Sequence, residues 1–217
     1  MCANDVRPTG RSRGRARVPP DARKRQLLTE AAQLLTEYGV ERVQITEVAE
    51  RAGVSRPLVY RLFPTRQALV RAILTDLADF LNEQFVVAQS RFDATSVEAL
   101  ATAFVEASCE AIAQKGAGPW LLLDPRGPDP EINRLGRAIF EELLDPWQQQ
   151  LGSFLGVSPE RAAHLLWIIV AAGRAALVGW IEGAVSREQA GRDATRVITT
   201  LLAAFTSDAL RPSPAQT

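Results

Sequence analysis

Apolar residues recur every three or four positions along the first part of the chain, which is the spacing of an amphipathic helix. From Asp21 this pattern predicts a helix that ends at Gly39, where a C-terminal cap belongs. Its apolar positions are Leu27, Leu28, Ala31, Leu34, Leu35 and Tyr38. Two shorter helices are predicted over residues 45–52 and 55–63, and Pro64-Thr65 separates them from a longer helix.

The same helical spacing continues to the end of the chain, and no segment shows the alternation of a strand. Four further helices are predicted, over residues 96–115, 130–144, 158–183 and 186–210, with Ser96 and Ser158 as N-terminal caps of the first and the third. Residues 116–119 are expected to end the first of them, and residues 120–123 to form a short apolar turn. Pro146 is expected to kink or break the second, because proline lacks the backbone donor that the helix needs. The fold class is therefore all-α.

The composition changes along the chain and suggests four segments. Residues 1–20 combine five arginines with glycine and proline and show no apolar periodicity, so we interpret them as a flexible basic arm. This arm either contacts DNA or is a solvated tail. Residues 21–67 and 68–210 are the two expected domains, and residues 211–217 are a tail rich in proline and serine.

The charge of the two halves differs although the whole chain is neutral. Residues 1–71 contain 14 basic and 7 acidic residues, whereas residues 72–217 contain 11 basic and 18 acidic residues. A basic half points to nucleic acid or a membrane surface. No membrane association is expected, because the longest apolar run, residues 165–180, contains Arg174 and is short of a bilayer span. With only two cysteines, Cys2 and Cys109, a cytoplasmic protein is expected.

The two short helices are joined by Gly53-Val54-Ser55, which is the turn of a helix-turn-helix motif. Apolar residues on both helices predict a small shared core (Val48, Ala49, Ala52, Val54, Val59, Leu62 and Phe63). The opposite face of the second helix then presents a mixed polar and basic set (Ser55, Arg56, Pro57, Leu58, Tyr60 and Arg61). Such a helix fits the major groove of DNA.

This face carries side chains suited to base readout. Arg56 is able to bond guanine O6 and N7 in bidentate fashion, and Pro57 and Leu58 are able to contact a thymine methyl group. The alternative is that the arginines form a solvated face and that Tyr60 packs in the core.

The segment from Ile45 to Phe63, followed by Thr65-Arg-Gln-Ala-Leu69, resembles the N-terminal domain of the TetR family of bacterial transcription regulators. The resemblance includes the Ala-Gly-Val-Ser turn, the tyrosine three residues before Phe63, and the preceding Tyr38-Gly39. It implies that Tyr60 and Arg66 hold phosphates and that Thr46 touches the DNA backbone or a base edge. Gln44 stands where the family usually has threonine or serine as a cap, and Arg66 replaces the usual lysine, which changes the donor geometry.

The resemblance also implies a C-terminal helical domain for ligand binding and dimerisation. In the helix from Ser158, small residues recur every four positions (Ala171, Ala175, Gly179 and Gly183), while the rest of the helix is apolar nearly all round. We expect this stripe, with Leu201 and Phe205 of the last helix, to form a homodimer interface. The alternative is the central helix of a monomeric bundle.

A small apolar or amphipathic effector is the expected ligand of this domain. Ligand pockets are mostly apolar with few polar groups. The predicted ligand-binding residues are Phe104, Trp120, Phe140, Trp147, His164 and Trp167. Trp120 is placed at the mouth of the loop formed by residues 116–130. For each of these residues, packing in the core is the competing interpretation.

No catalytic constellation, metal-ligand spacing or cofactor motif is present in the sequence, so we expect no enzyme, no metal and no cofactor. The predicted function is a ligand-responsive regulator that binds double-stranded operator DNA as a homodimer, and specifically a repressor that a small molecule releases. The alternative is a helical ligand-binding or interaction protein with a vestigial DNA-binding head.

Overall fold

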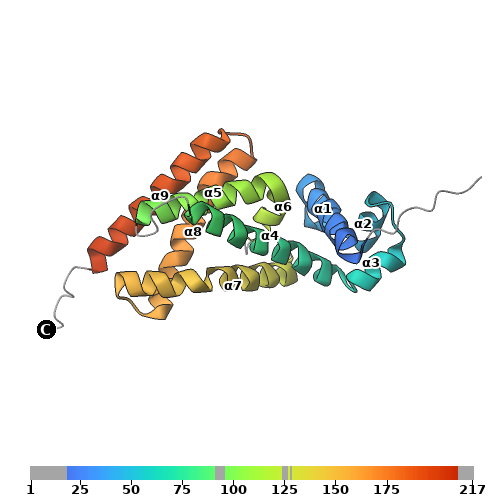
Figure 1. Cartoon of the computed structure of the whole chain (residues 1–217), viewed down its shortest axis with the longest axis horizontal. Helices are drawn as coiled ribbons and strands as arrows, with labels where there is room; N and C mark the ends of the chain where they lie inside the picture. The colour runs from blue at the N-terminus through green and yellow to red at the C-terminus, as the bar shows by residue number, and fades with distance from the viewer. Residues whose placement is uncertain (1–18, 91–95, 124–126, 128, 210–217) are drawn as a thin grey trace, which may run out of the picture.

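The computed structural model describes residues 19–90, 96–123, 127 and 129–209, and in this part of the chain every regular element is helical. Figure 1 shows a small helical domain at one end joined to a larger bundle. The elements are α1 (Pro20–Tyr38), the 3₁₀ helix η1 (Val40–Arg42), α2 (Ile45–Arg51), α3 (Arg56–Leu62), α4 (Arg66–Gln89), α5 (Val97–Lys115), α6 (Ala117–Leu121), α7 (Pro130–Leu155), α8 (Pro159–Ile181) and α9 (Arg187–Ala209). The basic arm and the C-terminal tail predicted from the sequence lie largely or wholly outside the described residues.

Helices α1, α2 and α3 form the small domain, which we call the head. Its core contains the predicted Val48, Ala49, Val59 and Phe63, all of which are buried, whereas Ala52, Val54 and Leu62 pack against this core and are half-buried. Gly53 adopts a φ of 63° in the turn between α2 and α3, a left-handed conformation that favours glycine. The predicted helix-turn-helix is therefore present.

Tyr38 differs from the prediction that it belongs to the apolar face of α1. Its side chain is 60% exposed, and the Arg42 guanidinium lies 6.0 Å from the centre of its ring. It is the last residue of α1, and Gly39 reverses the chain with a φ of 78° directly after it. The helix thus ends at the predicted position, but its last apolar position faces solvent.

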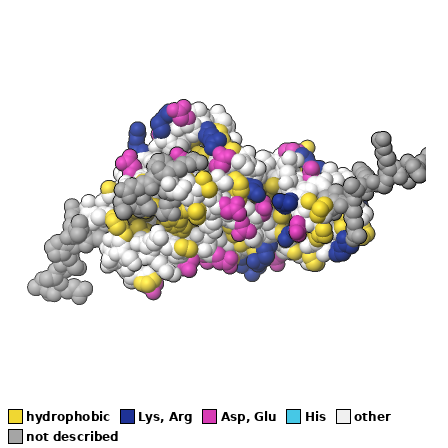
Figure 2. All heavy atoms as spheres, viewed as in Figure 1, with side chains coloured by type: hydrophobic (Ala, Val, Ile, Leu, Met, Phe, Trp, Pro, Cys, Tyr) yellow, Lys and Arg dark blue, Asp and Glu magenta, His cyan; other side chains and the backbone are white. Residues whose placement is uncertain are grey.

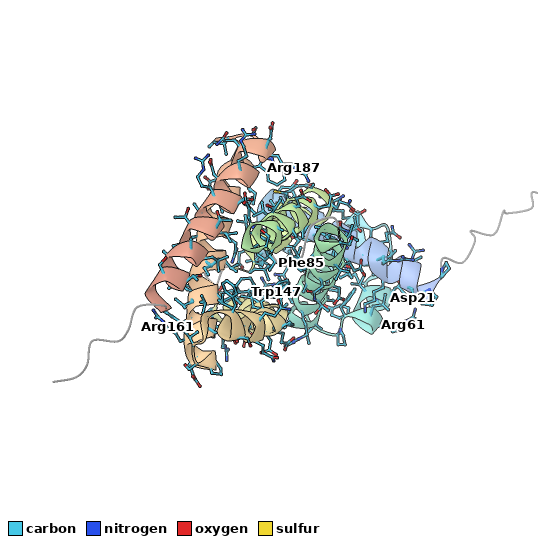
Figure 3. The ribbon with its side chains drawn as sticks, turned by 60° about the vertical axis from the view of Figure 1, so that its left-hand side comes forward. Asp21, Arg61, Phe85, Trp147, Arg161 and Arg187 are labelled. Carbon is cyan, nitrogen blue, oxygen red and sulfur yellow. The ribbon has the colours of Figure 1, made fainter. Side chains whose placement is uncertain are left out.

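Helix α4 belongs to both parts of the molecule. It begins beside the head, where the Thr65 hydroxyl accepts a hydrogen bond from the backbone N–H of Ala68. It then runs into the bundle, which we call the body, and packs there against α5 and α7 (Figure 1). The rings of Phe85 on α4 and Trp147 on α7 meet edge to face with centroids 4.2 Å apart, and Figure 3 shows them pointing toward one another.

The body is completed by α5, α7, α8 and α9. Arg174, the one charge in the apolar run of α8, lies between the rings of Trp120 and Phe140, at 5.6 and 5.7 Å from their centres. Its Nη2 also donates a hydrogen bond to the backbone carbonyl of Trp120 at 3.2 Å. Cation–π contacts of this kind keep a guanidinium stable within an otherwise apolar interior.

Two predicted boundaries are wrong. Residues 117–121 form the short helix α6 rather than only ending α5. Helix α7 continues through Pro146 to Leu155, although the prediction ended it at Leu144. Apolar side chains on both sides of the proline are buried, among them Leu144 and Leu151, so packing along the whole helix outweighs the backbone donor lost at Pro146.

Helix α8 is long and apolar enough to cross a membrane by length and composition alone. In this structure one side of it packs against α7 and α9. Core helices of soluble proteins also reach this length and apolar composition. Ser158 caps its N-terminus as predicted, with its hydroxyl accepting from the backbone N–H of Arg161 at 3.3 Å.

Candidate DNA-binding surface and effector cavity

The predicted reading face of α3 is exposed to solvent. Ser55, Arg56, Pro57 and Arg61 are exposed, and the Tyr60 side chain is 49% exposed, so Tyr60 does not belong to the core. Leu58 on α3 and Thr46 on α2 are half-buried. Val59 and Phe63 hold the opposite side of α3 in the core of the head, which fixes the outward direction of the reading face.

The side chains at the N-cap positions of α2 and α3 make no capping hydrogen bonds among the described residues. Ser55 occupies the N-cap position of α3 with extended backbone, but its hydroxyl makes no capping hydrogen bond among the described residues. Gln44, at the N-cap of α2, also makes none, as its departure from threonine or serine predicts. Its amide instead donates to the backbone carbonyl of Glu41 at 3.1 Å. The head is therefore held by its core and by ion pairs.

Arg51 ties α2 to α1 and is a structural residue of the head. Its guanidinium bonds both carboxylate oxygens of Glu37, at 2.6 and 2.7 Å, and one oxygen of Glu30 at 3.1 Å. The hydrogen bond from Arg51 lowers the pKa of Glu37, and the same bond raises the pKa of Arg51. This network occupies Arg51 on the side of α2 that faces α1.

The two arginines of the reading face differ in their surroundings. Arg56 Nη2 lies 2.8 Å from Oε1 of Glu50 on α2, and both side chains are more than half exposed. Arg61 has no hydrogen-bond or ion-pair partner in the part of the chain that the structure describes. Figure 3 shows Arg61 at the end of the molecule opposite α9. One arginine is thus oriented by a neighbour, and the other is free to turn.

Arg66 does not have the surroundings that the resemblance implies. Its guanidinium donates to the backbone carbonyls of Val40 at 2.8 Å and Val43 at 3.2 Å, and to Asp129 Oδ2 at 3.0 Å. The side chain is only 20% exposed. In this conformation the donors of Arg66 are directed inward and are not presented to a phosphate as the resemblance implies.

Asp129, the ion-pair partner of Arg66, accepts further hydrogen bonds at the start of α7. Asp129 Oδ1 accepts from the backbone N–H groups of Glu131 and Ile132 and so caps α7. These backbone bonds and the Arg66 guanidinium hold the pKa of Asp129 below its ordinary value, with the bond from Ile132 as the largest cause. Figure 2 shows basic and acidic side chains intermingled on the visible face between the head and the body.

The body contains an apolar cavity of about 270 Å³ among α5, α7, α8 and α9. Among the described residues that line it, none is charged and Gln150 alone has an amide side chain. The lining residues are Leu100, Ala101, Phe104, Leu144, Trp147, Gln150, Leu151, Phe154, Leu166, Ile169, Val170, Ile198 and Leu202. An apolar cavity of this kind suits a ligand group without charge.

The predicted ligand-binding residues separate into three groups. Phe104 and Trp147 line the cavity. Trp120 and Phe140 lie next to a void of only about 20 Å³, and Trp120 is 2% exposed, so it is a core residue rather than the mouth of a loop. His164 and Trp167 are exposed on α8 and do not line this cavity, so their predicted contact with a ligand finds no support there.

A larger groove of about 830 Å³ lies among α4, α5 and α9 and has a different chemistry. Charged side chains line it, among them Glu110, Arg187 and Arg192, and Arg187 pairs with Glu110 at 3.0 Å. Cys109 also lines it, and burial raises the pKa of the Cys109 thiol. This open, charged groove is less suited to an apolar molecule than the cavity.

The predicted dimer residues belong to α8, α9 and the turn between them, and Leu201 and Phe205 pack partly against the core. Ala175 is exposed, whereas Ala171, Gly179, Leu201 and Phe205 are half-buried. Gly183 lies beyond the end of α8, in a turn with a φ of 75°. The close approach of α8 to α9 occurs at another residue, Gly173, where an added Cβ would lie 2.8 Å from Cδ1 of Ile198. The sequence did not single out Gly173.

The chain thus combines a helix-turn-helix, whose second helix is exposed and basic, with a helical body that contains an apolar cavity. Residues 27–73 match the family model described as bacterial regulatory proteins of the tetR family. Residues 27–73, which contain the helix-turn-helix, are therefore similar to the DNA-binding domain of the TetR family of bacterial regulators.

Two relatives match this chain over a short segment. An HTH-type transcriptional regulator of Mycobacterium tuberculosis is 46% identical over 59 residues, which cover 27% of this chain and 31% of that protein. The HTH-type transcriptional activator FasR of Mycolicibacterium smegmatis is 36% identical over 77 residues, which cover 36% of this chain and 35% of FasR. The chain thus matches about a third of the length of these relatives.

Similarity in fold extends over most of the chain. The transcriptional regulator FadR of Bacillus subtilis, solved in complex with stearoyl-CoA, superposes with a TM-score of 0.59 and covers 84% of this chain and 97% of FadR. The two sequences are 12% identical. This likeness concerns the arrangement of the helices.

Proposed function

We propose that this protein is a cytoplasmic, homodimeric repressor that binds operator DNA through α3 and is released by a small apolar or amphipathic molecule. The observation that carries the proposal is the exposed face of α3, which presents Arg56, Tyr60 and Arg61 while its opposite side is buried. A helix held in this way is able to enter the major groove without unfolding any part of the head.

The roles of the three side chains follow from their surroundings. Arg56 lies in the first turn of α3 and pairs with Glu50, and we assign it to a base edge because an arginine is able to bond guanine in bidentate fashion. Arg61 and Tyr60 lie further along the same helix, and we assign them to phosphates because phosphate contacts need charge and donors but little precise orientation. Pro57 and Leu58 supply apolar contact to thymine.

Dimerisation is supported by the outer surface of α8 and α9. Trp167 on α8 is 47% exposed and Val197 on α9 is 36% exposed, and the exposed Ala175 lies on α8 as well. Apolar side chains on two adjacent helices favour burial against a second copy. Dimerisation also places two heads on one side of the duplex, which a tight and specific complex of small reading modules requires.

The effector is assigned to the apolar cavity of the body. Its uncharged lining supports a ligand whose buried part is a hydrocarbon chain or ring. The structurally similar FadR of Bacillus subtilis was solved with stearoyl-CoA, which carries such a chain. In the proposed mechanism, a ligand in the cavity favours a body conformation in which the spacing of the two heads no longer fits the DNA.

Selection from random-sequence duplex DNA with the full-length protein tests the DNA-binding part. We expect enrichment of a two-fold symmetric site whose half-sites lie about one helical turn apart. Enrichment of no sequence at all would instead support a ligand-binding protein with a vestigial head. Transcription from the selected site, with and without the protein, then separates a repressor from an activator such as the relative FasR.

A further inference from the structure

Arg66 links three segments that are far apart in the sequence. It is the first residue of α4, and its three bonds reach Val40 and Val43 in the segment before α2 and Asp129 at the start of α7. Each bond uses a different nitrogen, Nη2, Nε and Nη1 respectively. A guanidinium donates in several fixed directions of one plane, whereas the ammonium of lysine is a single compact charge. The structure thus gives a reason for arginine at this position.

Asp129 uses both of its carboxylate oxygens as hydrogen-bond acceptors. One carboxylate oxygen caps α7 through the backbone N–H groups of Glu131 and Ile132, and the other accepts from Arg66. The same helix α7, further along, contributes Leu144, Trp147 and Leu151 to the apolar cavity. A continuous helix therefore connects the cavity with the carboxylate that holds Arg66.

We propose that Arg66 is a positioning residue that transmits the position of α7 to the segment before α2, and that it does not bind a DNA phosphate. When α7 shifts, Asp129 shifts with it because it caps that helix. Arg66 then moves the carbonyls of Val40 and Val43, and with them the start of α2. The role of this link in ligand response rests on the proposed function, but its existence in the free protein does not.

Amide hydrogen exchange of the full-length protein without DNA tests the link itself. Asp129→Asn keeps a side-chain oxygen for the cap, where asparagine and aspartate are about equally good, but removes the negative charge. Arg66→Lys keeps the positive charge but loses the planar guanidinium, whose three nitrogens donate to three different partners. We expect each variant to speed exchange of residues 39–45 by roughly two- to tenfold. The double variant should be no faster than either single variant, because both remove the same link.

The matched control is Gln67→Ala. Gln67 makes an exposed hydrogen bond to Glu131 across the same junction at 3.0 Å, so its loss should leave exchange of residues 39–45 unchanged. If Arg66→Lys speeds exchange while Asp129→Asn does not, Arg66 acts only within the head, and the proposed link to α7 is wrong.

The dependence of DNA affinity on salt separates the link from a phosphate contact. On the selected duplex, we expect Arg66→Gln and Asp129→Asn to weaken binding without changing the slope of log affinity against log salt. A phosphate contact would instead lower the slope by about one for Arg66→Gln and leave Asp129→Asn at least as tight as the wild type. A wild-type protein that selects no DNA would overturn the proposed function, while the exchange experiment would still decide the link.

Discussion

The head and the body place their functional groups in opposite ways. In the head, a small buried core supports charged side chains on the surface, and five residues within the short helix α3 or its turn form the exposed face. In the body, the candidate site is a cavity lined by uncharged side chains of four helices. The function of the head is therefore local in sequence, whereas that of the body depends on how distant helices pack.

The arginines of the head show the same contrast on a smaller scale. Arg51 and Arg66 are held by several bonds and face other parts of the protein. Arg56 has one partner, and Arg61 has none among the described residues. Equal charges in the sequence thus serve different purposes, and only the packing around them distinguishes structural arginines from those available to DNA.

The largest expected effect concerns the junction of head and body. Gly118 of α6 packs on α1 so closely that an added Cβ would lie 2.6 Å from the backbone nitrogen of Thr36. Gly118→Ala should therefore lower the free energy of unfolding by about 3 kcal/mol, because the backbone must move. The matched control Gly152→Ala, whose Cβ would have no neighbour closer than 3.4 Å, should be neutral or stabilising. Urea denaturation measures both, and equal stabilities would show that head and body do not pack this closely.

Within the head, Arg56→Ala and Arg61→Ala should have different effects on DNA binding. Arg56→Ala should cost about 2 kcal/mol at one base pair and relax the preference there, since a bidentate contact to a base is lost. Arg61→Ala should weaken binding to all sequences alike and lower the salt slope by about one. Binding titrations on single-base variants of the selected site measure this, and identical profiles for the two variants would contradict the assigned roles.

In the body, Ala101→Leu should block the apolar cavity, since Ala101 is 4% exposed and lines it. For the wild type, we expect the affinity for n-alkanols to rise by about 0.8 kcal/mol per methylene group until the cavity is filled. The variant should bind the best alkanol about tenfold more weakly, a cost of about 1.4 kcal/mol. The control Ala113→Leu makes the same change at an exposed position of α5. Calorimetry that finds no chain-length dependence would place the effector elsewhere.

The smallest expected effect concerns Glu50. Glu50→Gln should reduce discrimination at the base pair read by Arg56 by less than about 1 kcal/mol, because exposed ion pairs contribute little. It should also raise the affinity for unrelated DNA slightly, since one negative charge leaves the reading face. A competition assay between specific and random duplexes measures the ratio. An unchanged ratio would mean that Glu50 does not orient Arg56.

The sequence was sufficient for the features that depend on nearby residues. The turn at Gly53, the caps at Ser96 and Ser158, and the exposed face of α3 follow from helical spacing and cap chemistry. The continuation of α7 through Pro146 could not be predicted from the sequence, because it depends on the burial of side chains against other helices.

The remaining features depend on residues that are distant in sequence. Arg66 and Asp129 are 63 positions apart, so no local pattern indicates their bond. The cavity joins residues from Leu100 to Leu202, and the aromatic residues of the body look alike in the sequence whether they line it or not. Trp147 lines it, whereas Trp167 faces solvent, and only the fold separates the two.

The most direct test is a hydroxyl-radical footprint of the full-length protein on the selected duplex. Two heads carried by one dimer predict two protected stretches on the same side of the duplex, centred about one helical turn apart. Arg56→Ala should lose this pattern at concentrations where the wild type gives it in full. A single protected stretch, or the same pattern for the wild type and the variant, would contradict sequence reading by paired α3 helices.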